Sequence, residues 1–152
     1  LYWKNTFNLF NDLRNRGVLE KFSNNFFYFG ILSCVFLILH ATFLGMDFDS
    51  KLFDQTRRLI IISFIFFELA AQATLTQNLY RFKEELQKHI SIKILKIKII
   101  FIIILLLMTC LVFLYLALGE PSTAFKHIVE WNYFSILLLY YLLSRMLWLK
   151  KA

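Results

Sequence analysis

The sequence predicts an all-α membrane protein with four transmembrane helices, both termini on the same, cytoplasmic-type side, and an N-terminal amphipathic interfacial helix. Three observations predict this class. The 152 residues are 59% hydrophobic, well above the apolar share of an ordinary soluble domain. Only four Gly and one Pro are present, which disfavours a β fold rich in tight turns. Four segments also reach the length of about 20 apolar residues that a helix needs to cross a bilayer.

Residues 1–24 are predicted to form an amphipathic arm in the membrane interface. Their apolar residues recur at helical spacing, at Trp3, Phe7, Phe10 and Leu13. Polar side chains lie between them, and Gly17 is expected to end the helix. The apolar stripe would equally suit packing on the inner ends of the spans or on another subunit, and both interpretations stay open.

Residues 25–150 are predicted to form the transmembrane domain. Its spans are expected at about residues 26–45, 59–79, 97–118 and 131–149. None of these runs alternates with period two between turns, so membrane strands are excluded. The stretch "IKILKIK" before the third span alternates, but it has no partner strand, and we expect it to open the third helix.

The distribution of basic residues sets the predicted direction of the spans. Thirteen Lys and Arg side chains lie on the side of the two termini and the loop between spans two and three, against four on the other side. Because basic residues concentrate in cytoplasmic loops, both termini are expected in the cytoplasm or its equivalent. An even number of spans agrees with this placement.

The net charge is +7, and the basic residues lie beside the apolar spans. This position favours anionic lipid headgroups as partners rather than nucleic acid. No Gly-rich phosphate loop, nucleophile set or cluster of three metal ligands is visible. We therefore expect no catalytic residue, no metal site and no enzymatic activity, and the sequence identifies no cofactor. Cys34 and Cys110 lie inside apolar runs and are expected to be small apolar residues rather than a disulfide pair.

Glu68 is the most informative candidate, because it lies near the middle of the second span. A charged group at that depth costs about 2.5–3.5 kcal/mol on an insertion scale, so it must face protein or water, or carry a proton. Gln72 and Thr76 follow at i+4 and i+8 and give the helix a polar seam on one side. The seam would either bind a cation or relay a proton, or serve as hydrogen-bonding glue between helices. The second hypothesis is favoured, because a single acid without a cationic partner is a weak basis for a pump.

Two further polar positions are candidates. His40, in the first span, would hydrogen-bond to Ser63, reach toward Glu68, or ligate a pigment metal, with a buried polar contact favoured. His127 and Glu130 stand three apart near the outer interface and are interpreted as a polar pair rather than half of a metal site, because such sites need more ligands on other helices.

These features favour a small structural or accessory subunit of a larger membrane complex, in contact with other membrane protein subunits. The first alternative is a small oligomeric ion channel or proton-coupled transporter that uses Glu68. The second is a pigment-, lipid- or quinone-binding membrane protein that uses His40. The bias toward Phe, Ile, Lys and Asn suggests an AT-rich genome, so we expect a bacterial inner membrane or an organellar membrane.

Overall fold

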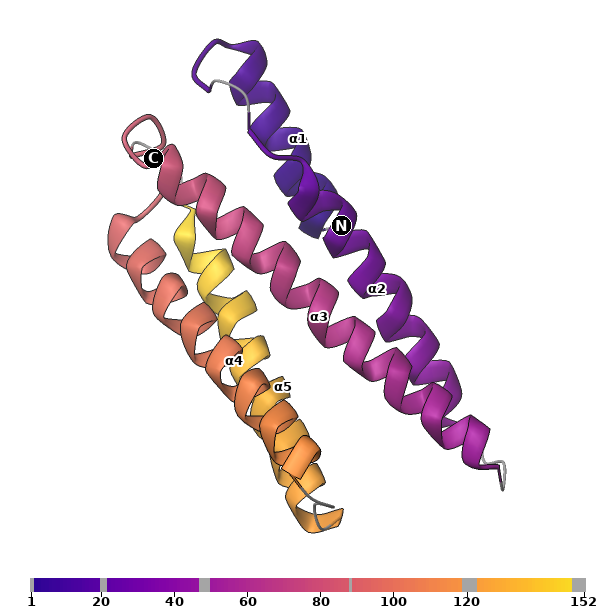
Figure 1. Cartoon of the computed structure of the whole chain (residues 1–152). Helices are drawn as coiled ribbons and strands as arrows, with labels where there is room; N and C mark the ends of the chain where they lie inside the picture. Colours follow the sequence, from indigo (N-terminus) through magenta and orange to yellow (C-terminus); the bar gives the residue numbers. More distant parts are fainter. Residues whose placement is uncertain (1, 20–21, 47–49, 88, 119–122, 149–152) are drawn as a thin grey trace. The chain divides into compact units, whose positions relative to one another are not determined.

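A computed structural model shows that the chain is all-α (Figure 1). Within the described residues its five helices are α1 (Tyr2–Asn15), α2 (Asn25–Leu44), α3 (Lys51–Arg81), α4 (Ile92–Leu118) and α5 (Thr123–Leu147). The structure describes residues 2–19, 22–46, 50–87, 89–118 and 123–148, without the side chains of 112–113, 115–118, 123–127 and 129–130. The stretch "IKILKIK" is helical, as predicted, because α4 begins at Ile92.

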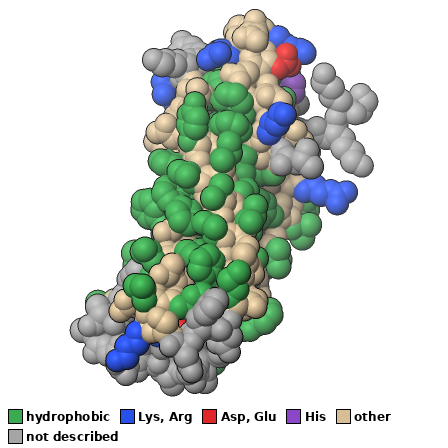
Figure 2. Space-filling view, turned by 90° about the vertical axis from the view of Figure 1, so that its right-hand side faces the viewer, with side chains coloured by type: hydrophobic (Ala, Val, Ile, Leu, Met, Phe, Trp, Pro, Cys, Tyr) green, Lys and Arg blue, Asp and Glu red, His purple; other side chains and the backbone are tan. Residues whose placement is uncertain are grey.

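Three described helices are long and apolar enough to cross a membrane: α2, α3 and residues Ile92–Leu111 of α4. The predicted all-α class is confirmed, and these three helices are of the kind that a multi-pass membrane protein needs. The predicted fourth span lies in α5, which is not among the three, so that crossing stays a prediction. Hydrophobic side chains make up much of the surface visible in Figure 2.

The helix α1 ends as the sequence predicts. Gly17 has a positive φ of 71°, which a residue without Cβ adopts at no steric cost. The Val18 N–H bonds to the Leu13 carbonyl and the Gly17 N–H to the Arg14 carbonyl, both at 3.0 Å. This pair of bonds is the Schellman motif, and it satisfies carbonyls that the helix end would otherwise leave unpaired.

The apolar face of α1 packs against the first turns of α2. Phe7 stacks on Phe27 with ring centroids 4.6 Å apart, and the Phe10 ring lies 5.7 Å from that of Phe26. Trp3, at 5% exposure, covers Gly30, where no other residue would leave room for the indole. The arm therefore packs on α2 of its own chain, while its contact with the interface or another subunit stays a prediction.

Helices α2 and α3 form an antiparallel hairpin joined by aromatic contacts. Phe36 stacks on Phe67 at 5.5 Å, and Phe43 stacks on Phe53 at 5.7 Å. The helix α3 begins at Lys51, eight residues before the predicted span. A helix continues through polar residues that a count of apolar residues omits, and Asp54 in the first turn favours the helix N-terminus.

Residues Leu1–Asn78 form one compact unit, and Leu79–Ala152 form a second.

The second unit is an α4–α5 hairpin. The buried residues of the two helices recur every three or four positions, at Leu95, Lys98, Ile102 and Leu105 on α4 and at Tyr133, Leu137, Tyr140, Ser144 and Leu147 on α5. This spacing is that of facing helices that interdigitate. One end of the hairpin is closed by the backbone, because the Ser91 N–H bonds to the Leu147 carbonyl at 2.9 Å and Ile90 pairs with Trp148 in an antiparallel bridge.

Candidate functional site

The acid in the middle of α3 faces α2. Glu68 is 2% exposed, and its Oε2 lies 2.8 Å from the Ser33 hydroxyl of α2. Its Oε1 accepts a hydrogen bond of 2.8 Å from the Gln72 amide, one turn further along α3. Both carboxyl oxygens are therefore bonded to side chains of the same hairpin.

The other two residues of the predicted seam are also buried. Gln72 is 0% exposed and Thr76 is 4% exposed. The Gln72 Oε1 atom has no hydrogen-bond partner among the described residues, although its Nε2 is bonded to Glu68. A buried amide oxygen without a donor is costly, so this atom is an acceptor position that the described part of the chain does not fill.

A second polar contact joins α3 to the segment before α2. The Asn78 Nδ2 donates to the Ser23 carbonyl at 2.9 Å, and the Ser23 N–H donates to Asn78 Oδ1 at 3.4 Å. The side-chain amide of Asn78 therefore bonds to both the carbonyl and the N–H of Ser23, as a residue of a neighbouring β-strand would. Together with Glu68 and Ser33, this contact fixes the register of the antiparallel hairpin at two heights.

A buried cation lies in the α4–α5 hairpin. Lys98 is 0% exposed, and its Nζ donates to the Ser144 hydroxyl at 2.6 Å and lies 4.3 Å from the centroid of the Tyr140 ring. The hydroxyl of Ser144 donates in turn to the Tyr140 carbonyl at 3.0 Å. Among the described residues no carboxylate lies within ion-pair distance of Lys98. A hydroxyl and an aromatic face therefore stabilise this ammonium group.

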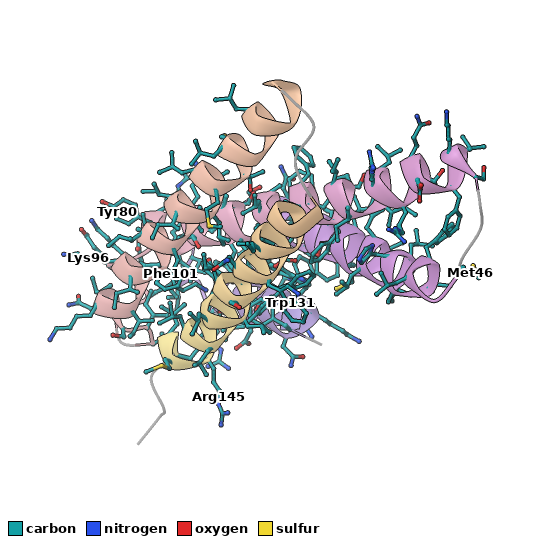
Figure 3. The ribbon with its side chains drawn as sticks, turned by 90° about the horizontal axis from the view of Figure 1, so that it is seen from below. Met46, Tyr80, Lys96, Phe101, Trp131 and Arg145 are labelled. Carbon is teal, nitrogen blue, oxygen red and sulfur yellow. The ribbon has the colours of Figure 1, made fainter. Side chains whose placement is uncertain are left out.

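Other basic residues near Lys98 behave as surface residues. Lys96 and Arg145 are exposed and point away from α4 and α5 (Figure 3). The sequence predicted Lys98 to be a loop residue on the side with most of the basic residues. Without Lys98, that side still carries more basic residues than the other, so the predicted direction of the spans does not change.

The roles of the remaining candidates stay predictions. His40 is half-buried on α2, two turns beyond Ser33, and its contact with Ser63 or Glu68 stays a prediction. The backbones of His127 and Glu130 lie in α5, but their side chains are outside the described residues. A search of the described residues finds no group of three side chains able to hold a metal ion.

Most residues at these contacts, among them Ser33, Asn78, Lys98 and Ser144, were not among the predicted site residues. Ser33 and Lys98 became visible only with the helices paired, because a serine in an apolar run commonly bonds to its own backbone and a lysine near a span end commonly reaches the surface. The signal available in the sequence was their depth: Ser33 lies eight residues inside α2, and Lys98 six residues inside α4.

Neither the family models, nor the curated proteins, nor the solved structures contain a match to the chain.

Proposed function

We propose that this chain is an integral multi-pass membrane protein that acts as a non-catalytic structural or accessory subunit of a larger membrane assembly. The observation that supports it is the position of Glu68. Its two oxygens are bonded within the α2–α3 hairpin, to Ser33 and Gln72, as expected for hydrogen-bonding glue between helices.

The proposed topology has four crossings, with the fourth in α5 and both termini on the side that carries most of the basic residues. Exposed Lys96 and Arg145 suit contact with anionic headgroups on that side. The membrane would be a bacterial inner membrane or an organellar one. Nucleic acid is not proposed as a partner.

The proposed contact with other subunits uses exposed apolar side chains of the first unit. Ile38 on α2 is 67% exposed and Phe66 on α3 is 63% exposed. Either lipid or a partner helix can cover such positions, so they are the places to test. Leu75 of α3, at 1% exposure, provides a matched buried control.

The test places a photo-crosslinking amino acid at Ile38, Phe66 or Leu75 in the native membrane. We expect a discrete adduct with another protein from at least one exposed position, and none from Leu75. Adducts with lipid alone, from a chain that migrates as a monomer in mild detergent, would overturn the proposed role as a subunit.

A proton-coupled transporter or channel is the second candidate, and one observation favours it. The unpartnered Gln72 Oε1 leaves room in the hydrogen-bond network beside Glu68 for a water or a cation. The test is proton flux in vesicles that contain the purified chain, read with an internal pH dye. Transport through this site requires flux that Glu68→Gln abolishes; flux that is absent, or equal in the variant, argues against it.

A further inference from the structure

The hydroxyl of Ser33 has two oxygen neighbours at hydrogen-bond distance. Its Oγ lies 2.9 Å from the Gly30 carbonyl of its own helix and 2.8 Å from Glu68 Oε2. A serine hydroxyl has one hydrogen to donate and two lone pairs that accept. It can therefore donate to one neighbour only, and the other contact needs a hydrogen from the other side.

The Gly30 carbonyl has no hydrogen, so only Glu68 can supply the second one. We propose that Glu68 carries a proton on Oε2 and donates it to Ser33, which makes the Ser33–Glu68 pair an intramembrane proton-binding site. The hydrogen bonds then run in one direction. Glu68 Oε2 donates to Ser33 Oγ, Ser33 donates to the Gly30 carbonyl, and Gln72 Nε2 donates to Glu68 Oε1.

The burial of the pair agrees with a neutral acid. Ser33 is 1% exposed and Glu68 is 2% exposed. Burial of an ionised carboxylate costs far more than burial of a neutral hydrogen-bonded acid, and a buried network stabilises a fold when its members are satisfied. On α2, the exposed Cys34 thiol lies close enough to interact electrostatically with Glu68, and it also lies within hydrogen-bond reach of the Ser33 side chain.

This proposal goes beyond the role as a subunit, because it states what the acid holds and which residue receives the hydrogen. It is also independent of transport, since a bound proton need not move. The unpartnered Gln72 Oε1 defines the competing occupant, a small monovalent cation such as Na⁺, which carboxylate, amide and hydroxyl oxygens would bind in place of the proton.

The first test is infrared spectroscopy of the full chain in lipid vesicles at neutral pH, with carbon-13 labelled glutamate to identify carboxyl bands. We expect the carbonyl band of a protonated acid, lost in Glu68→Gln and moved to higher frequency in Ser33→Ala, where the acid loses its acceptor. Loss of carboxylate bands alone in Glu68→Gln would overturn the proposal. The Gln side chain keeps the shape and a donor at this position, and far-ultraviolet circular dichroism checks the fold.

The second test needs no substitution and uses a lipid-soluble carbodiimide. The acid proton moves to one nitrogen of the reagent and a carboxyl oxygen bonds to its central carbon; the adduct then rearranges to a stable N-acylurea with no group lost. We expect the added mass on Glu68 and not on Glu84 or Glu85, which are exposed in the loop. Absence of the adduct on Glu68, or its suppression by added Na⁺, would overturn the proposal, the latter in favour of a cation site.

Discussion

The packing of the N-terminal arm on α2 depends on one glycine. A Cβ atom at Gly30 would lie 2.5 Å from both Cγ and Cε2 of Trp3. Because Cγ is at the root of the indole, rotation of the ring cannot relieve the clash. The whole of α1 would have to move by more than 0.9 Å to restore an ordinary contact of 3.4 Å, because Trp3 Cδ2 lies closer still to this Cβ position. We therefore predict that Gly30→Ala weakens the packing of α1 on α2.

The magnitude follows from two opposing effects. Replacing Gly by Ala inside a helix normally stabilises the helix by about 0.5–1 kcal/mol. Inserting a methyl group into a filled contact costs about 1–3 kcal/mol. The net expected loss is about 1–2 kcal/mol. A loss of about 1.4 kcal/mol reduces the ratio of docked to undocked arm about tenfold.

The assay is the fluorescence of Trp3 in a chain where Trp131 and Trp148 are replaced by Phe. In the docked arm Trp3 is 5% exposed, so acrylamide should quench it slowly. We expect faster quenching and a shifted emission maximum in Gly30→Ala, and a larger change in Gly30→Leu.

Gly45 provides the matched control. A Cβ there meets only the Thr42 carbonyl, at 3.8 Å, which is an ordinary contact. Gly45→Ala should therefore leave the quenching of Trp3 unchanged. Unchanged quenching in Gly30→Ala, together with a gain of about 0.5–1 kcal/mol in stability, would refute the reasoning, because that is the result expected of a helical glycine that nothing covers.

Three further predictions concern the polar contacts and the lipid-facing surface. Asn78→Leu should lower the free energy of unfolding in detergent by about 1–3 kcal/mol, because it leaves the Ser23 backbone groups unpaired; an unchanged midpoint in a thermal melt would contradict the contact. Lys98→Met should leave the stability unchanged or raised, since it replaces a buried charge with an apolar side chain of similar length, whereas Ser144→Ala should lower it by about 1–3 kcal/mol. The opposite order of the two melts would show that Lys98 is not buried against Ser144. Cys34 and Cys110 are exposed on candidate spans, so a lipid-soluble maleimide should label them in vesicles and a charged one should not; labelling by the charged reagent would place them in water.

The positions of the helices could be predicted from the sequence better than their ends. The apolar runs of α2 and α4 are continuous, and the predicted starts at residues 26 and 97 fall within five residues of the observed Asn25 and Ile92. The start of α3 differs most, because a run that ends at a charged residue marks the edge of the hydrocarbon and not the end of the helix. The arm was predicted as a helix with an apolar stripe, and its position on α2 depends on Trp3 and Gly30, which lie 27 residues apart and have no shared local pattern.

Only part of the candidate site could be predicted from the sequence. Glu68, Gln72 and Thr76 share one side of one helix, and helical spacing alone predicts that. The partner of Glu68 lies 35 residues away on α2. Such a partner depends on the register of two apolar helices, and no periodicity within either helix sets that register. Lys98 and Ser144, 46 residues apart, were hidden for the same reason.

In both hairpins, a buried polar pair fixes the register of two apolar helices. In a bilayer, apolar side chains gain little by exchanging lipid for another helix, so apolar contacts alone leave two helices able to slide past each other. Each hairpin has a buried ionisable group held by a serine of the antiparallel partner, Glu68 by Ser33 and Lys98 by Ser144. A shift of one helical turn, about 5.4 Å, would break either bond and leave the ionisable group without its hydroxyl partner. The buried polar pairs therefore select one register from many apolar alternatives, and this role requires neither member of a pair to move an ion.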